Sequence, residues 1–485
     1  MSRPPPDPAF WTRIVHQLQS KRWVRLWIFP LVVQLVANVV FISLERGPFE
    51  NSWIFIKLRS LGFDWSINSV DQRDRTIEDA APPLVIVDIS RMPRVDFEGN
   101  AQGTGFRSTE DFTSRQELLK IARALAEKYD VAGIGIDVDF SPDYSIRGGR
   151  TPAGQEDLLE YALALSETAT LPDHINQPVP IYFGVGRGTA SGKTMDWLGN
   201  PDFADLAATL VLLTDSPRDT PIIYSRAPTI VRAPSPEEAD QAPLRGLAAA
   251  LAGVYREQLG IPLNTPVPPF LAPFVEDQHD LSLVDQSGRP LIGRSFYLNY
   301  QQTHLLAYGM IDAEWITTAT LEQEHLLRSQ LQGKLVLLGN ADEQATGDQL
   351  VMLGHRNPVP GVFAHGCAIL TLLESPISRL TFISEVTLGI LLSLFANAAV
   401  AGARQFIPRL DASLHVNARN QVLELLATLI LVFLVSGAIG HRWNILWLGA
   451  ISTAVGSCVE TCCLLCLPLT DASPEPSITP DPNSN

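Results

Sequence analysis

The sequence predicts a membrane protein in which an α/β domain with a mainly parallel sheet is joined to about four transmembrane α-helices, one N-terminal and three C-terminal. Long apolar runs with few charged residues gather at the two ends of the chain. Strand and helix patterns alternate in the segment between them, which is typical of parallel sheets. Arginine residues flank the apolar runs on one side, which indicates a fixed orientation across a membrane.

The N-terminal apolar run, LWIFPLVVQLVANVVFISL at 26–44, follows a basic segment and contains no charged residue. As a helix it extends for about 28 Å, close to the thickness of the hydrocarbon core of a bilayer. No small-residue cleavage site follows it, so we predict an uncleaved anchor helix over 23–45. Gln34 and Asn38 share one face of this helix. They are expected either to bond to another helix inside the membrane or to face water beside Pro30.

The C-terminal end holds three further apolar runs that predict transmembrane helices over 382–403, 422–439 and 445–469. The loop at 404–421 carries three arginines against a single acid, so the positive-inside rule places this loop and the N-terminus on the cytoplasmic side. Glu424 and Glu460 fall within the predicted spans, where a carboxylate costs about 2.5–3.5 kcal/mol to insert. We therefore expect both to contact another helix, with proton or ion transport as the alternative.

Composition sets further limits on the chain. The net charge of −16 over 485 residues, with a pI near 5.0, excludes the basic face that nucleic-acid binding needs. All the cysteines lie late in the chain, so the α/β domain is not expected to depend on disulfides. They are Cys367, Cys458, Cys462, Cys463 and Cys466. The last four lie in an apolar run, and we interpret them as small helix residues rather than metal ligands.

These patterns predict a multi-pass protein of the bacterial inner membrane whose main domain is extracytoplasmic. The predicted segments are 1–22 (cytoplasmic N-terminus), 23–45 (transmembrane helix), 46–381 (extracytoplasmic domain), 382–403 (transmembrane helix), 404–421 (cytoplasmic loop), 422–439 and 445–469 (transmembrane helices), and 470–485 (disordered cytoplasmic tail).

Within 46–381, the apolar run at 84–90 predicts a strand buried on both faces. Ser114 and Glu117 have the spacing of a capping box that opens a helix, and a second buried strand follows at 131–140. Strand, helix and strand in this order predict a parallel pair. Further elements are a helix at 321–331, a strand at 334–340, a helix at 364–374, and strand candidates at 180–186 and 295–300. The proline-rich stretch 187–290 is expected to hold long loops.

Several polar residues follow the predicted strands or lie in the segments after them. In open parallel sheets the carboxyl ends of the strands form the ligand-binding edge, where carboxylates can bind a hard cation or a polar ligand. The alternative is that these residues cap helices and bond to loop amides. The candidate ligand-binding residues are Asp88, Asp137, Asp139, Asn340, Asp348 and His365. No dinucleotide-binding glycine pattern or catalytic triad is recognised, so no cofactor and no catalytic residue are expected.

The domain resembles the CHASE domain of the second type, a cyclase- and histidine-kinase-associated sensory extracellular family, over about 46–380. The segments that carry the resemblance are FDWSINSVDQRD (63–74), PPLVIVDIS (82–90), the helix led by Arg115 with GIGIDVDF (133–140) after it, GKLVLLGNADEQATGDQ (333–349) and PVPGVFAHGCAILTLLE (358–374). The Trp-Pro motif usual after the first strand is replaced by RMPRVDFEGN (91–100).

The resemblance implies a membrane-anchored sensor that detects an unidentified small molecule or ion. Family members commonly carry a fused effector domain, and since none is recognised in this sequence, we expect the signal to pass to a separate cytoplasmic effector. Its expected partners are the lipid bilayer, the ligand and that effector, and a homodimer is an open alternative. No catalytic or effector domain is recognised, so an enzyme is not expected. Two other functions stay open: a transporter component, suggested by Glu424 and Glu460, or an extracytoplasmic enzyme that uses Asp88, Asp137 and Asp139.

Overall fold

The computed structural model divides the chain into two compact units. The larger contains Phe63–Leu380 and Ile439–Leu446, and the smaller contains Met1–Gly62, Thr381–Ala438 and Trp447–Asn485. The structure describes residues 83–96, 100–103, 112–140, 152–167, 177–186, 205–214, 223–232, 244–260, 268–273, 281–284, 290–300, 303–342, 349–352, 357–373, 378–406, 416–443 and 445–447, with scattered positions between 32 and 65 and between 450 and 458.

The larger unit is built on a 13-stranded sheet. Ten strands follow one another across it in the order β12 (Leu281–Val284), β13 (Pro290–Tyr297), β9 (Ile223–Arg232), β10 (Leu244–Gly246), β7 (Ala207–Thr209), β6 (Ile181–Val185), β5 (Gly133–Ile136), β15 (Leu335–Gly339), β1 (Leu84–Asp88) and β14 (Ile311–Asp312). Three more strands branch from this path: β8 (Leu213–Thr214), β16 (Gln349–Met352) and β17 (Val359–Pro360). Pairing is parallel from β10 to β14 and antiparallel from β12 to β10.

The sheet is therefore mixed, which corrects the predicted mainly parallel sheet. Its antiparallel half comes largely from the stretch 187–290, where we expected loops. Pro228 lies in the middle of β9, and the pairing of β9 with β13 shifts register between Arg294 and Ser295 at that point. A proline and a register shift interrupt the alternation that identifies a strand, so this half of the sheet is hidden from pattern analysis.

The strand β15 lies between β1 and β5, so the strand–helix–strand unit predicted from the sequence is parallel but not a neighbouring pair. In register, Val87 of β1 lies beside Leu338 of β15, and Leu338 lies beside Ile136 of β5. In the sheet, β1 and β5 are thus connected through β15, which comes about two hundred residues after β5 in the chain.

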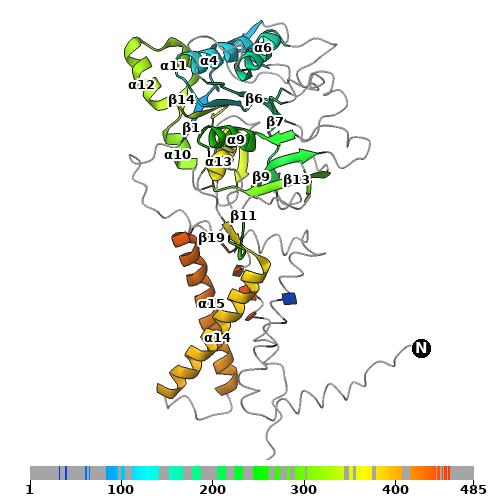
Figure 1. Cartoon of the computed structure of the whole chain (residues 1–485), viewed down its shortest axis with the longest axis vertical. Helices are drawn as coiled ribbons and strands as arrows, with labels where there is room; N and C mark the ends of the chain where they lie inside the picture. Colours follow the sequence, from blue (N-terminus) through cyan, green and yellow to red (C-terminus); the bar gives the residue numbers. More distant parts are fainter. Residues whose placement is uncertain are drawn as a thin grey trace, which may run out of the picture. The chain divides into compact units, whose positions relative to one another are not determined.

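Two layers of helices cover the parallel half of the sheet (Figure 1). One layer holds α4 (Arg115–Glu127), α6 (Gln155–Ser166), α11 (Ala313–Thr318) and α12 (Leu321–Leu331), and the other holds α9 (Leu247–Gln258), α10 (Thr303–Tyr308) and α13 (Gly361–Leu373). Side chains alternate between the layers: Val85 and Val87 belong to the core under α4, whereas Ile86 lies beside Gly366 of α13. Burial on both faces explains the continuous apolar strands.

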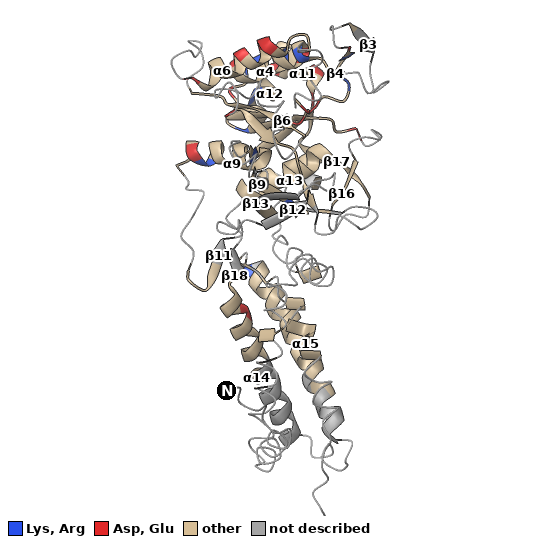
Figure 2. Cartoon of the chain, turned by 90° about the vertical axis from the view of Figure 1, so that its right-hand side faces the viewer, with Lys and Arg blue, Asp and Glu red and all other residues tan. Residues whose placement is uncertain are grey.

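The helix α13 differs from the outer helices in its composition. Acidic and basic residues lie along α4 and acidic residues along α6 and α11, whereas α13 carries no Asp, Glu, Lys or Arg (Figure 2). All its residues from Gly361 to Leu372 are buried, and it packs against β1, β15, α9 and α10. His365, 5% exposed, is therefore a polar residue inside an apolar helix.

Two small sheets complete the larger unit. In one, β2 (Arg94–Val95) pairs antiparallel with both β3 (Ala101–Gly103) and β4 (Phe112–Thr113). In the other, β18 (Ser378–Leu380) pairs antiparallel with β11 (Leu271–Pro273) and parallel with β19 (Ile445–Leu446).

The prediction of transmembrane helices is wrong. Within the part of the chain that the structure describes, no helix has both the length and the apolar character needed to cross a membrane. The predicted location in a bacterial inner membrane, with an extracytoplasmic main domain, fails with it. The predicted span at 23–45 lies almost entirely outside the described residues.

The C-terminal elements show why the hydropathy of sequence runs misled the prediction. The helix α14 (Phe382–Phe406) buries Glu385 in its first turn, at 1% exposure. The helix α15 (Val416–Trp443) begins inside the predicted loop and so takes up Arg419 as well as Arg442. The third run begins as the strand β19. The mean hydropathy of an apolar run leaves out the polar residues that the helix includes beyond the ends of the run. It also does not show whether part of the run pairs in a sheet.

The polar contacts predicted inside the membrane depended on the transmembrane helices, so they have no basis without them. Gln34, Asn38 and Glu460 lie outside the described residues, and Glu424 lies in α15.

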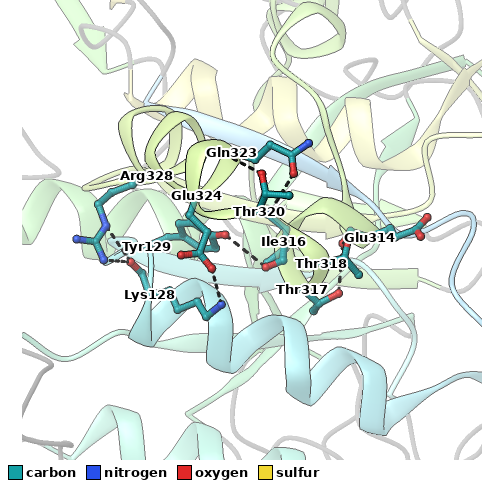
Figure 3. Close-up of polar contacts among 10 residues, drawn as sticks. All are labelled: Lys128, Tyr129, Glu314, Ile316, Thr317, Thr318, Thr320, Gln323, Glu324 and Arg328. Carbon is teal, nitrogen blue, oxygen red and sulfur yellow. Dashed lines mark hydrogen bonds and ion pairs between the residues drawn. The ribbon is translucent and has the colours of Figure 1, made fainter.

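The C-terminus of α4 is held to α11 and α12 by polar contacts between residues far apart in sequence (Figure 3). Lys128 Nζ lies 2.9 Å from Glu324 Oε1, and Arg328 donates from Nε and Nη2 to the Lys128 carbonyl oxygen. The Tyr129 hydroxyl donates to the Ile316 carbonyl oxygen at 3.4 Å, and Tyr129 is 1% exposed. The buried bond should stabilise the fold more than the exposed ion pair, which solvent screens.

We therefore expect Tyr129→Phe to lower the free energy of unfolding by about 1 kcal/mol, because the buried Ile316 carbonyl oxygen would lose its donor. Lys128→Met should cost less, and its effect should shrink as salt is added. Urea denaturation of both variants at low and high ionic strength measures the difference. An equal or larger loss in Lys128→Met, or a loss in Tyr129→Phe that shrinks as salt is added, would contradict this ranking.

Candidate functional site

The parallel register brings two of the predicted acids into one row at the carboxyl edge of the sheet. Asp88 at the end of β1 lies beside Gly339 at the end of β15. On the other side of β15, Asp137 follows directly after Ile136 of β5, and its amide donates to the Leu338 carbonyl oxygen at 2.7 Å. Two carboxylates thus flank a position that has no side chain.

Asp88 serves as a connection between two loops. Its Oδ1 accepts hydrogen bonds from the Ser90 amide at 2.9 Å and from the Ala341 amide at 3.0 Å, and its Oδ2 accepts one from Ser90 Oγ at 2.8 Å. The carboxylate therefore ties the segment after β1 to the segment after β15. This arrangement matches the structural alternative considered for the acids, in which they satisfy loop amides.

Asn340 and Asp139 make similar local bonds. Asn340 Oδ1 accepts from the Asp342 amide at 3.1 Å, which forms a tight turn after β15. Asp139 Oδ1 accepts from the Gly186 amide at 3.0 Å and so joins the ends of β5 and β6. Asp348 lies outside the described residues.

Arg115 at the start of α4 is a buried residue of this edge that the site prediction omitted. It is 1% exposed, it donates from Nη2 to the Asp139 carbonyl oxygen at 3.2 Å, and its guanidinium lies 3.8 Å from the centre of the Phe140 ring. A helix that opens with arginine directly after a capping serine was the available signal, because this position places the side chain at the strand ends.

Asp137 and His365 form the most unusual pair of the edge. Their side chains are 8% and 7% exposed, and His365 Nε2 lies 3.8 Å from Asp137 Oδ1. The other carboxyl oxygen of Asp137, Oδ2, is buried and has no hydrogen-bond partner among the described residues. Burial raises the pKa of the Asp137 carboxyl group from 3.8 to about 7. The pair therefore combines a buried acid that titrates near neutrality with an imidazole.

Gly339 allows α13 to approach this row closely. A Cβ atom at Gly339 would lie 2.7 Å from Cβ of Val362, closer still to Cγ2 of Val362, and 3.2 Å from Cβ of Asp137. Since Val362 and His365 are both in the first turns of α13, the missing side chain lets this helix bring His365 to Asp137. The chemistry of the strand ends thus depends on a glycine that was not among the predicted site residues.

The described part of the chain contains no group of three or more His, Cys, Asp and Glu side chains that could hold a metal ion. The three predicted acids are distributed differently: Asp88 and Asp139 bond to loop amides, and Asp137 faces His365. What the edge can do chemically therefore rests on Asp137 and His365, which can accept, donate or transfer a proton.

No family model, curated protein or solved structure matches the chain. The resemblance to the CHASE domain of the second type remains a prediction from the sequence.

We expect Gly339→Ala to lower the free energy of unfolding by about 1–3 kcal/mol, because the added methyl group overlaps Val362. Gly133→Ala is the matched control: it lies on the neighbouring strand β5, where the nearest atom to a new Cβ is the movable Leu335 Cδ2 at 3.2 Å. Urea denaturation compares the two variants. Equal stability losses would show that Gly339 does not set the position of α13.

A second expectation concerns the pH dependence of stability. The folded pKa of Asp137 is above its unfolded value, so its contribution to stability is present at acidic pH and is lost as pH rises from about 4 to about 7. Asp137→Asn removes this titration. The stability of the variant relative to the unmodified protein should therefore increase by at most about 1.4 kcal/mol per pH unit over this window. Denaturation at pH 5 and pH 8 measures it, and parallel pH curves would contradict it.

Proposed function

We propose that the larger unit is a ligand-binding sensory domain whose ligand bonds to Asp137 and His365 at the carboxyl edge of the parallel strands. The buried Asp137 Oδ2, which lacks a hydrogen-bond partner among the described residues, carries this proposal. Buried polar oxygens are nearly always paired in native proteins, and an unpaired one costs about 1–3 kcal/mol. A ligand that bonds to this oxygen would remove that cost.

The place of the pair in the fold supports the same proposal. Ligands of open α/β sheets bind outside the carboxyl ends of the strands, which is where β1, β15 and β5 end. Ionisable groups with strongly shifted pKa values cluster at functional sites, and Asp137 is such a group. Asp88 shares the strand-end position, but its two oxygens already accept hydrogen bonds from loop groups. The shifted pKa and the unpaired Oδ2 therefore select Asp137.

The helix α13 offers a way for the domain to transmit the binding event. It carries His365, and it packs against α9 and α10 as well as against the sheet. A ligand that binds one position of α13 more tightly shifts the population of the domain towards that position. We propose that a separate effector protein detects this shift, in line with the resemblance to sensory domains.

A thermal-shift screen of a metabolite library against the purified full-length chain tests the proposal. At least one compound should raise the melting temperature of the unmodified protein and of Asp157→Asn, but not of Asp137→Asn. Asp157→Asn is the matched control, because Asp157 is exposed in the first turn of α6. Compounds that stabilise Asp137→Asn as strongly as the unmodified protein would show that the ligand site lies elsewhere.

A further inference from the structure

The chemistry of the edge narrows the class of ligand. The ionisable groups next to Asp137 at this edge are Asp88 and Asp139 on the strand ends, with His365 from α13 and Arg115 from α4. Farther along the edge, Asp312 at the end of β14 forms an ion pair with Arg91, so these two charges balance each other. The Arg115 guanidinium donates to the Asp139 carbonyl oxygen and lies over the Phe140 ring. Around Asp137, the three carboxyl groups outnumber the Arg115 guanidinium and the His365 imidazole. This charge balance favours a positively charged ligand.

A bare divalent cation fits this edge poorly. Calcium takes six to eight oxygen ligands and magnesium requires a complete octahedron. Asp88 uses both of its oxygens in bonds to Ser90 and Ala341, and Asp139 Oδ1 bonds to the Gly186 amide. Asp137 Oδ2 is thus the acceptor that remains buried and unpaired among the described acids. One such acceptor suits a group with a few directed N–H donors.

We propose that the ligand is a small organic amine whose primary ammonium group bonds to Asp137 Oδ2, a proposal that rests on the function proposed above. The ammonium group supplies three N–H donors, one for the unpaired oxygen and others for neighbouring acceptors. Binding forms an ion pair between the ammonium group and the Asp137 carboxylate. The fraction of Asp137 that was protonated before binding gives its proton to the buffer, so charge and protons balance.

Matched probes of equal chain length separate this ligand class from others. The probes are ethylamine, butylamine and hexylamine, the corresponding alcohols, and acetate, butyrate and hexanoate. Isothermal titration calorimetry on the full-length chain measures their binding, which for such small ligands is expected in the millimolar range. The amines should bind, while alcohols and carboxylates of the same length should bind at least about tenfold more weakly.

The dependence of amine binding on pH gives a second readout on the unmodified protein. Affinity for butylamine should fall about tenfold for each pH unit below 7, because the proton on Asp137 competes with the ammonium group. Repeating the titration at one pH in buffers of different ionisation enthalpy should show that protons are released. Asp137→Asn should abolish amine binding, while Asp157→Asn should retain it.

The outcomes distinguish this inference from the proposed function. Alcohols or carboxylates that bind more tightly than the amines, and that lose affinity in Asp137→Asn, would overturn the amine class and leave the ligand site in place. Amine binding that is unchanged in Asp137→Asn would overturn both. Failure of every amine to bind at millimolar concentration, or an affinity that does not change with pH, would overturn the amine class alone.

Discussion

The close approach of α13 to the end of β15 is the constraint on which the rest of the edge depends. At Gly339 the strand has no side chain, and Val362 of α13 fills the space. The same contact places His365 beside Asp137, and it lets the apolar helix seal the face of β1 and β15. Because close-packed interiors deform little, a helix fixed at this depth also fixes the polar pair.

Keeping Asp137 buried lowers the free energy of unfolding of the domain. An acid in this position favours its neutral form, so the domain is least stable relative to its unfolded chain where the acid must ionise. A carboxamide or an apolar residue would avoid this cost. Buried polar oxygens are normally hydrogen-bonded, and an exception without an evident structural gain usually marks a functional site. Asp137 Oδ2 is such an exception, whereas Asp88 and Asp139 accept hydrogen bonds from loop amides.

Elements defined by local chemistry could be predicted from the sequence. The helix predicted over 321–331 has the bounds of α12, because Thr320 and Gln323 form a complete capping box at its start. The strands around 84–90 and 334–340 were visible because burial on both faces makes them continuously apolar. The acids at the strand ends followed from the same reasoning.

Features that depend on distant pairing could not be predicted. The contact between Asp137 and His365 requires the packing depth of α13, which Gly339 sets and no local pattern shows. Whether an acid is occupied by loop amides, as Asp88 is, depends on a segment that lies 253 positions away. The apolar ends of the chain were wrongly predicted as transmembrane helices because hydropathy takes no account of sheet pairing, as in β19, or of polar residues that a helix includes beyond the run, as in α15.

The position of β15 between β1 and β5 has a consequence for the biosynthesis of the chain. A ribosome adds about 5–20 residues per second, so roughly 10–40 seconds pass between the synthesis of β5 and that of β15. During this interval β1 and β5 have no central strand to pair with, and their apolar faces and unpaired edges are open to other chains. The sheet closes late and through contacts of long sequence separation, which makes folding slow. Exposed apolar surface and unpaired strand edges make such a nascent chain prone to aggregation until Leu335–Gly339 has been synthesised.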